Sequence, residues 1–498
     1  MTAQKRKIKK LLIANRGEIA IRIMQTCREM GIKTVAIYSE EEKDYPHRFF
    51  ADESISLGLG TLKETYLNSD KIIDIAVNAK CDAIHPGYGF LSERTHFAKD
   101  VEKNGMIFIG PRPENIELMG DKKTSKEKIL ELDVPSIPGY HGDNQKPDHL
   151  HSEAKKMGYP VLIKASAGGG GKGMRIVYND QEFLGELEGA KREALNAFND
   201  DTVLIEKFIT SPRHIEVQVM SDAHGQHFHL FERECSIQRR YQKIVEESPS
   251  VALSPELRKA MTDAALKITR GINYLGAGTI EFILDTDGKF YFLEMNTRLQ
   301  VEHPVTEMVT GLDLVKLQIL VAEGEKLNLN QSELKQSGHA IEVRLYAEDP
   351  DNDFLPSIGK IQYIGKPTVR HSRLDCGFIA GNDVTIQFDP MLAKLIVWGD
   401  NRAEAIHKML LALDQTPFLG LKTNHDYLKR ILALPEFAEG LTFTHFVKTY
   451  KDKLQPVGES DDLLASAIAL ELCHPTTLGD TSEQSKSSWD KLSHFRLV

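Results

Sequence analysis

Short apolar runs alternate with stretches of helical hydrophobic spacing through the first part of the chain. The spacing over Ile19–Met30 and Lys71–Ala79 predicts helices, and strands are predicted at Lys10–Ala14, Lys33–Tyr38, Ala83–His85 and Ile107–Gly110. Strands that alternate with helices pair in parallel, because each helix carries the chain back across the sheet. The sequence therefore predicts an α/β region built on a doubly wound parallel sheet.

The later pattern divides the chain further. Strands are predicted at Pro160–Lys164 and Arg175–Tyr178 around a glycine-rich run, and then, mostly as hairpins, at His214–Met220, His227–Glu232, Ala277–Leu284 and Lys289–Glu294. We expect the following parts: a doubly wound domain over 1–115, a linker helix over 116–137, a mobile lid over 138–208, a β-rich C-terminal domain over 209–455, and a tail over 456–498 that starts a linker to a further domain.

Composition and charge narrow the function classes. Of 498 residues, 41% are hydrophobic and 27% charged, which is ordinary for a globular protein, and a formal net charge of −10 gives no basic excess for nucleic acid. No run approaches the ~20 apolar residues of a membrane helix, and the basic N-terminus lacks a signal-peptide apolar region. The five cysteines are scattered without a CxxC pair, which is typical of a reducing compartment. We expect a cytoplasmic protein that binds neither nucleic acid nor membrane.

A glycine-rich run, Ser166–Gly173, follows the strand that ends at Lys164. Consecutive glycines allow backbone N–H groups to approach a phosphate without a side-chain clash. The usual P-loop pattern fails, because position 166 is Ser and Gly173 stands where a Ser or Thr follows the lysine. A flexible linker is the alternative, but the flanking Lys164 and Lys172 favour a flap that closes over phosphates.

A carboxylate pair is predicted from hairpin counting. Asp287-Gly288 is a preferred two-residue turn, and with it Thr286 pairs with Lys289 and Glu281 falls opposite Glu294. Like charges that face each other across two strands destabilise the pair, and a divalent cation between them reverses the effect. Oxygen ligands favour magnesium or manganese. Two solvated strand carboxylates are the alternative.

Polar residues continue beyond this pair at every second position. An extended chain would place Glu294, Asn296, Arg298, Gln300 and Glu302 on one side and Met295, Leu299 and Val301 on the other. We interpret the polar side as a site floor, with metal ligands first, then an anion-binding arginine, then a base. A second basic stretch, Arg233–Lys243, is either a solvated face or an anion-binding segment.

Several long stretches, taken in chain order, resemble the biotin carboxylases of the ATP-grasp superfamily. The matching stretches are Ile13–Ala20, His85–Glu93, Met119–Lys122, Lys164–Arg175, Glu206–Phe208, Pro212–Gln218, Cys235–Arg240, Glu294–Glu307, Ala340–Arg344 and Asp389–Met391. The likeness extends over about residues 8–450 and is collinear, which makes it far more specific than a lone glycine motif. It implies an ATP-grasp fold with a doubly wound N-terminal domain, a lid and a β-rich C-terminal domain.

The resemblance also implies a nucleotide and metal site. Lys122 and Lys164 would hold phosphates, Glu206 and the main chain of Lys207 to Ile209 would line the adenine, and His214 and Gln238 would lie by the ribose. The full implied ATP set is Lys122, Lys164, Gly168, Gly169, Gly170, Gly171, Glu206, Lys207, Ile209, His214, Gln238, Tyr241 and Ile283. Glu281, Glu294 and Asn296 would bind Mg²⁺ or Mn²⁺, in agreement with the hairpin count.

For the other substrates the resemblance implies further roles. Bicarbonate would bind Arg298, Gln300, the Val301 main chain and Lys243. Glu302 would be the base, and Arg344 would stabilise the biotin enolate beside Tyr88 and Gly89. The implied catalytic residues are Glu302, Arg298, Lys243 and Arg344. The implied reaction is ATP- and bicarbonate-dependent carboxylation of biotin through carboxyphosphate, as the first half-reaction of an acyl-CoA carboxylase.

The implied partners are a biotin carboxyl carrier domain or protein and a carboxyltransferase subunit, in a homodimer or a larger complex. The segments Asp461–Leu472 and Ser488–Val498 resemble the region after the carboxylase core in methylcrotonyl-CoA and propionyl-CoA carboxylase alpha subunits, and no Met-Lys-Met biotinylation motif occurs. Two alternatives stay open: another ATP-grasp carboxylate ligase with an acyl-phosphate intermediate, and a scaffold subunit that binds nucleotide without turnover.

One position departs from the family pattern. Tyr241 stands where the biotin carboxylases usually have His, and Tyr cannot become cationic near neutral pH. We expect altered ATP affinity with intact chemistry. The Michaelis constant for ATP should therefore change in Tyr241→His while the maximal rate is kept, and an unchanged constant would remove the role given to this position.

Overall fold

The N-terminal region of the computed structural model is a five-stranded parallel sheet with the strand order β3-β2-β1-β4-β5. Residues 5–166, 174–198, 200–240 and 242–456 are described. The strands are β1 (Lys10–Ile13), β2 (Lys33–Tyr38), β3 (Glu53–Ser56), β4 (Ala83–His85) and β5 (Ile107–Phe108). The predicted strands are confirmed with small changes at their ends, and β3 was missed.

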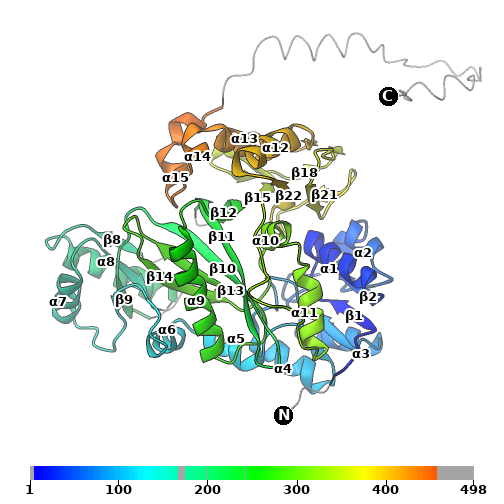
Figure 1. Ribbon diagram of the computed structural model, residues 1–498, viewed down its shortest axis with the longest axis horizontal. Coiled ribbons are helices and arrows are strands. Elements are labelled where there is room, and N and C mark those ends of the chain that lie inside the picture. Colours follow the sequence, from blue (N-terminus) through cyan, green and yellow to red (C-terminus); the bar gives the residue numbers. More distant parts are fainter. Residues whose placement is uncertain (1–4, 167–173, 199, 241, 457–498) are drawn as a thin grey trace, which may run out of the picture. The chain divides into compact units, whose positions relative to one another are not determined.

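Helices cover both faces of this sheet (Figure 1). They are α1 (Gly17–Glu29), α2 (Pro46–Phe50), α3 (Ser69–Asn78) and α4 (Thr95–Lys103), with the 3₁₀ turn η1 (Glu40–Glu42). Leu11 and Ile13 of β1 belong to the same buried cluster as Ile23 of α1. Leu12, between them, belongs to the cluster of Phe97 in α4, because successive strand residues point to opposite faces. The predicted doubly wound sheet is confirmed.

Two helices and a small antiparallel sheet follow. The helices are α5 (Pro113–Gly120) and α6 (Lys122–Glu131), and α6 begins where the Asp121 carboxylate accepts the Thr124 N–H at 2.7 Å. The small sheet has the order β6-β9-β7-β8 and is covered by two more helices. Its elements are β6 (Gly139–Tyr140), α7 (Pro147–Met157), β7 (Val161–Ala165), β8 (Arg175–Val177), α8 (Phe183–Phe198) and β9 (Val203–Lys207). This sheet has a core of its own, in which Leu150, Phe183 and Val203 are fully buried.

An eight-stranded antiparallel sheet dominates the rest, with the order β14-β13-β10-β11-β12-β15-β22-β20. The strands are β10 (Arg213–Ser221), β11 (His227–Arg239), β12 (Gln242–Ser248), β13 (Gly276–Leu284), β14 (Phe290–Asn296), β15 (His339–Tyr346), β20 (Ser372–Cys376) and β22 (Met391–Gly399). It includes strands from both ends of this region of the chain, so residues far apart in sequence become direct neighbours. The expected β-rich C-terminal domain is confirmed.

Helices and short ribbons complete this region. The helices are α9 (Pro255–Gly271), α10 (His303–Thr310), α11 (Leu314–Ala322), α12 (Arg402–Asp414), α13 (His425–Ala433), α14 (Pro435–Ala438) and α15 (Phe446–Thr449), with 3₁₀ turns η2 (Pro350–Asn352) and η3 (Lys451–Leu454). The ribbons pair β16 (Glu348–Asp349) with β17 (Leu355–Pro356), β18 (Gly359–Lys360) with β21 (Asp383–Val384), and β19 (Tyr363–Ile364) with β23 (Phe418–Leu419). Residues 1–454 group as one unit and the residues from Gln455 as another.

The predicted β13–β14 hairpin forms, but its turn was wrong. Asp285 and Lys289 flank a three-residue loop in which Gly288 has a φ of +81°, and the Asp285 N–H donates to the Lys289 carbonyl at 2.8 Å. The register of Phe282 with Phe292 is therefore shifted by one residue from the prediction. A β-bulge at Leu293 adds one residue to β14 and restores the register, so Glu281 does pair with Glu294.

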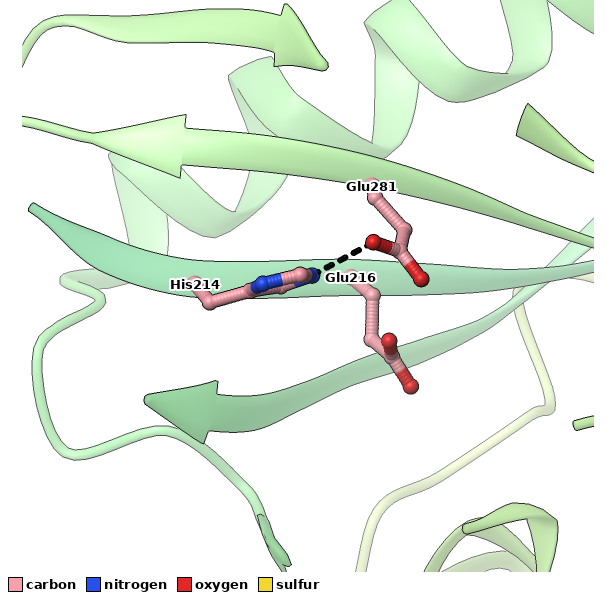
Figure 2. A group of neighbouring side chains, drawn as sticks. All are labelled: His214, Glu216 and Glu281. Atoms are coloured by element: carbon pink, nitrogen blue, oxygen red, sulfur yellow. Dashed lines mark ion pairs between the residues drawn. The ribbon is translucent and has the colours of Figure 1, made fainter. Parts of the chain in front are cut away.

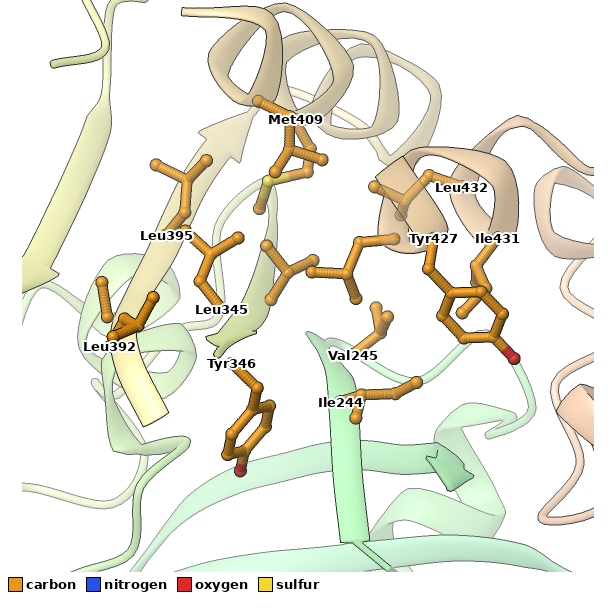
Figure 3. Packing of buried hydrophobic residues seen from close by; sticks show 14 of the residues in the cluster. Ile244, Val245, Leu345, Tyr346, Leu392, Leu395, Met409, Tyr427, Ile431 and Leu432 are labelled. Atoms are coloured by element: carbon orange, nitrogen blue, oxygen red, sulfur yellow. The ribbon is translucent and has the colours of Figure 1, made fainter. Parts of the chain in front are cut away.

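The largest buried cluster joins β15 and β22 to the helices α12 and α13 (Figure 3). Leu345 and Leu395 lie on the two strands, and Met409, Ile431 and Leu432 approach them from the helices. Leu395 is completely buried. This packing holds β15, which carries Arg344, against the rest of the sheet.

Leu395→Ala should lower the free energy of unfolding by about 2–5 kcal/mol, because it removes buried methyl groups and leaves a cavity that a sheet cannot close. Leu411→Ala on α12 is the control, since Leu411 is 41% exposed and its loss should cost less than about 1 kcal/mol. Urea denaturation followed by near-ultraviolet ellipticity measures both. Equal losses in the two variants would contradict this packing.

Candidate active site

A lysine whose side chain is only 13% exposed lies at the centre of the large sheet and bonds to three carboxylates. Lys243 Nζ on β12 donates to Glu216 Oε2 on β10 at 2.6 Å, to Glu281 Oε1 on β13 at 3.0 Å and to Glu302 Oε1 before α10 at 2.7 Å. Burial alone would lower the pKa of Lys243, but Glu216, Glu281 and Glu302 outweigh it and raise this pKa well above its usual value. The sheet thus holds one permanent cation among three acids.

Glu281 is the acid that connects this centre to the predicted metal ligands. It is buried, whereas Glu294 opposite it on β14 is exposed, and Asn296 Nδ2 donates to Glu281 Oε1 at 2.8 Å. Burial would raise the pKa of Glu281, but Lys243 and His214 lower it below the ordinary range. The pKa of Glu294 is raised, because the protein partly removes its carboxylate from water although other atoms of the residue stay exposed, and because Glu281 repels it. Two carboxylates and an amide oxygen fit a hard divalent cation such as Mg²⁺ or Mn²⁺.

His214 contacts this carboxylate directly. Figure 2 shows His214 and Glu216 on one strand, β10, and Glu281 on the neighbouring strand, β13, with the three side chains converging. His214 Nε2 lies 2.7 Å from Glu281 Oε2, and the ligand atoms of all three residues lie within 4.8 Å of one another. Gln238 Nε2 lies 3.0 Å from His214 Nδ1, so the two residues predicted at the ribose are neighbours.

The residues predicted for bicarbonate lie near the acids that surround Lys243. The extended chain predicted for them, however, ends at Asn296, the last residue of β14. Arg298 Nε donates to Glu93 Oε2 at 2.8 Å, and Arg298 Nη2 donates to Asn296 Oδ1 at 2.9 Å. Gln300 Nε2 donates to Glu281 Oε1 at 2.7 Å. Strict alternation was wrong beyond β14, because a turn replaces the strand before α10. The turn itself directs these side chains to the acids.

Glu302 lies directly before the first residue of α10 and is buried between two cations. Arg344 Nη2 donates to Glu302 Oε2 at 3.0 Å while Lys243 holds Oε1. Burial would raise the pKa of Glu302, but Lys243, Arg344 and Arg233 reverse this and hold it well below its usual value. Arg344 Nε also donates to Glu246 Oε1 at 2.6 Å. The predicted base and the predicted biotin-site arginine therefore form a direct ion pair.

The carboxylate of Glu206, predicted at the adenine, is buried and pairs with two lysines. Lys164 pairs with Glu206 Oε2, and Lys126, which sequence reasoning missed, pairs with Oε1. Lys126 lies one helical turn after Lys122 on α6, a spacing that could have signalled it. Burial lowers the pKa of Lys126 to about 7 and that of Lys164 to about 8, and repulsion from neighbouring lysines adds to both shifts.

Other predicted positions are placed as follows. Lys207 Nζ donates to the Gly158 carbonyl at 2.9 Å, Ile209 is buried, and Ile283 pairs with His214 across β10 and β13. Gly168, Gly169, Gly170, Gly171 and Tyr241 lie outside the described residues. Tyr88 and Gly89 lie in the loop after β4, where the Asn15 side chain donates to the Tyr88 carbonyl at 2.7 Å.

Arg233 is a central residue whose role the sequence left open. It is completely buried on β11 and donates to Glu216, Gln218, Thr306, Thr279 and Gln300 at 2.6–3.2 Å. Lys394 on β22 is equally buried and donates to the Val301 carbonyl at 2.7 Å. Of the two readings of the basic stretch, a solvated face is wrong for Arg233. It binds the residues that surround Lys243.

Three protein-family models match this chain. They are the N-terminal domain of biotin carboxylase over residues 7–116, the ATP-binding domain of the carbamoyl-phosphate synthase L chain over residues 121–330, and the C-terminal domain of biotin carboxylase over residues 342–449. Together they cover the doubly wound sheet, the small sheet and most of the eight-stranded sheet.

Individual relatives agree with these matches. The chain is 49% identical to the alpha subunit of mitochondrial methylcrotonoyl-CoA carboxylase from Dictyostelium discoideum, over 98% of this chain and 70% of that protein. It is 47% identical to the propionyl-CoA carboxylase alpha chain of Ruegeria pomeroyi, over 93% and 72%. The biotin carboxylase domain of Hydrogenobacter thermophilus 2-oxoglutarate carboxylase, a dimer solved with MgADP, ADP and bicarbonate, superposes with a TM-score of 0.85 at 45% identity, over 91% of this chain and 100% of that one.

The fold and the matched ATP-binding domain define an ATP-grasp enzyme, an ATP-dependent ligase. Within that class, the chain belongs to the biotin carboxylase family. It spans 62–70% of the length of the curated methylcrotonoyl-CoA carboxylase alpha subunits that it matches. Within the described parts of the chain, no helix is long and apolar enough to cross a bilayer.

Arg233→Lys should lower the free energy of unfolding by about 3 kcal/mol, because a lysine cannot satisfy the acceptors that surround the planar guanidinium. It should also raise the Michaelis constant for bicarbonate, since Gln300 loses its donor. Arg28→Lys is the control, because Arg28 is exposed and donates to one carbonyl. Denaturation and steady-state kinetics measure both variants, and similar behaviour of the two would contradict the role given to Arg233.

Proposed function

We propose that this chain carboxylates biotin with ATP and bicarbonate, as the first half-reaction of an acyl-CoA carboxylase. The single observation that carries the proposal is that Glu302 bonds to both Lys243 and Arg344, with Arg298 linked to the same acids through Asn296. A small anion that needs deprotonation finds cations to bind it and a carboxylate to take its proton in this arrangement. The family to which the chain belongs supports the same reaction.

ATP would bind between Glu206 and the acids of β13 and β14. Lys122, Lys126 and Lys164 supply positive charge for phosphates, and the residues of the glycine run are proposed as the flap. Glu281, Glu294 and Asn296 would hold Mg²⁺ or Mn²⁺, which neutralises phosphate charge when it is bound. His214 and Gln238 would contact the ribose, with Lys207, Ile209, Tyr241 and Ile283 around the base.

Glu302 would take the proton of bicarbonate. Its low pKa makes it a weak base while Lys243 and Arg344 hold it. Bicarbonate would compete with Glu302 for the ammonium group of Lys243. Its other contacts would be Arg298, Gln300 and the Val301 main chain. Weaker pairing with Lys243 would raise the pKa of Glu302 toward that of an ordinary carboxylate, so substrate binding itself would strengthen the base.

The later steps follow from the same groups. The bicarbonate oxyanion attacks the γ-phosphate, ADP leaves, and carboxyphosphate forms. Carboxyphosphate collapses to carbon dioxide and phosphate, the phosphate removes the N–H proton of biotin, and the enolate attacks carbon dioxide. Arg344 would stabilise that enolate, with Tyr88 and Gly89 lining the pocket. Enclosure of the site would protect the intermediate from water.

The wider assembly is proposed on the strength of the relatives. A biotin carboxyl carrier and a carboxyltransferase would supply and consume the carboxylated cofactor, and the chain would act as a homodimer or in a larger complex. We propose the division 1–115, 116–137, 138–208 and 209–455 for its domains, with 456–498 as a separate tail. A cytoplasmic location stays a prediction, and the methylcrotonoyl-CoA carboxylase relatives are named mitochondrial.

Glu302→Gln should reduce bicarbonate-dependent ATP cleavage by about 10²–10⁴-fold and leave ATP binding intact, because it removes the base and keeps the shape. Phosphate release with and without free biotin measures the activity, and equilibrium titration measures ATP binding. Free biotin should stimulate the wild-type reaction. Glu333→Gln, at an exposed position, is the control.

Three outcomes would contradict the proposal. Substantial turnover by Glu302→Gln would remove the base assignment. Wild-type ATP cleavage that free biotin does not stimulate would favour another ATP-grasp carboxylate ligase, and binding of ATP without any cleavage would favour a scaffold subunit.

A further inference from the structure

Two buried glutamates face each other behind Arg344. Glu246 on β12 pairs directly with Glu342 on β15, and neither has any exposed surface. Like charges at directly opposed positions repel, and burial removes the water that would screen them. Ionisation of both carboxyl groups at the same time is therefore unfavourable.

The hydrogen bonds of the pair are incomplete. Glu246 Oε1 accepts from Arg344 Nε at 2.6 Å, while Glu246 Oε2 and both oxygens of Glu342 have no donor among the described residues. The neighbouring cluster of Val305, Val309, Ala340 and Ile396 is apolar and buried. A buried ionised carboxylate without a donor is strongly unfavourable, whereas a neutral carboxyl is tolerated.

The charged groups around the pair are already engaged. Lys394 is the cross-strand partner of Arg344, so it is the diagonal neighbour of Glu342, but its Nζ donates to the Val301 carbonyl and lies 3.4 Å from Glu18. Arg344 divides its donors between Glu246 and Glu302, and Lys243 is held by its own three acids. None of these cations donates to Glu342.

One proton would remove the charge repulsion and supply the donor that Glu246 Oε2 lacks, leaving only the neutral carbonyl oxygen of Glu342 without a donor from any described residue. Directly opposed strand residues have Cβ atoms about 5 Å apart, a spacing that two carboxyl groups can bridge. A protonated Glu342 would present an O–H donor to Glu246 Oε2, which lacks one. The same proton would make Glu342 neutral in its apolar surroundings and leave a single negative charge opposite Arg344.

We propose that Glu342 is protonated at neutral pH, donates a hydrogen bond to Glu246, and through Glu246 positions Arg344 for the biotin enolate. The last part rests on the function proposed above. The pKa values agree with this assignment: burial raises the pKa of Glu342 well above the ordinary value and that of Glu246 to about 7, with Lys394 and Arg344 opposing the two shifts. Glu342 is a positioning residue, not a catalytic one.

The pair also links the site to pH. Loss of the proton would put two negative charges behind Arg344 and draw its guanidinium away from Glu302. The facing groups that decide the titration are Glu246, Lys394, Arg344 and Glu302. Because the pKa of Glu342 is raised on folding, its contribution to stability is complete below the ordinary range of glutamate and is lost as the pH rises through the raised value.

Protein stability tests the protonation state with a matched control. Glu342→Gln replaces a neutral carboxyl by a neutral amide and should keep or raise the unfolding midpoint, with a difference from wild type that grows as the pH rises. Glu232→Gln should lower the midpoint, because Glu232 on β11 is equally buried but accepts from Arg258 and Ser250. Equal destabilisation by the two substitutions would overturn the proposal.

Infrared spectroscopy tests the proton directly. The wild-type spectrum minus that of Glu342→Gln at pH 7 should contain the C=O stretching band of a protonated carboxyl, shifted in heavy water. The absence of that band would overturn the proposal. This measurement needs no turnover, so it is independent of whether the chain carboxylates biotin.

Kinetics test the positioning role. Glu342→Leu lacks the donor and should raise the Michaelis constant for free biotin by roughly tenfold. Glu342→Gln keeps a donor and should have a constant close to that of the wild type. Neither variant should change the Michaelis constant for ATP. Equal constants in the Leu and Gln variants would overturn the link to Arg344. A wild-type protein that never carboxylates biotin would instead refute the proposed function and leave the infrared result standing.

Discussion

The ammonium of Lys243 holds the active region together. Its three carboxylate partners come from β10, β13 and the segment before α10, so one side chain fixes the relative positions of three elements. Each ion would be costly to bury alone, and the energy of such a group is recovered only when geometry and additional hydrogen bonds are both good. The three acids need further hydrogen-bond donors besides Lys243, and the surrounding residues supply them.

Arg233 meets much of that requirement. It satisfies the second oxygen of Glu216 and holds Gln300, which in turn donates to Glu281. Lys394 fixes the Val301 carbonyl between Gln300 and Glu302. The turn that replaces the expected strand after β14 is therefore determined by ion pairs and hydrogen bonds with distant strands. A turn held by buried charges can present a base and an anion site with little freedom of movement.

The sequence predicted local structure well and long-range contacts unevenly. Lys33–Tyr38 and Ala83–His85 form the predicted strands because their apolar pattern alone demands burial. The pairing of Glu281 with Glu294 was predicted through two errors that cancel, a turn one residue too short and a bulge at Leu293 that no local pattern signals. Arg233 could not be placed from sequence, because its partners come from remote strands and from α10. Lys126 was missed, although its spacing from Lys122 on α6 is a local signal. Family resemblance, rather than spacing, supplied the roles of Lys243 and Arg344.

The charges of the site also explain why its substrates need more cations than the centre provides. Lys243, Arg233 and Arg344 are already matched by Glu216, Glu281, Glu302 and Glu246, so this part of the sheet has no surplus positive charge to offer. Bicarbonate and a nucleoside triphosphate such as ATP both add negative charge. In the proposed function, the balance would come from outside the centre: Arg298 on one side, the lysines around Glu206 on the other, and a divalent cation held by Glu281 and Glu294. A protonated Glu342 also reduces the excess of negative charge. Arg344 then faces one anion, Glu246, in the Glu246–Glu342 pair instead of two.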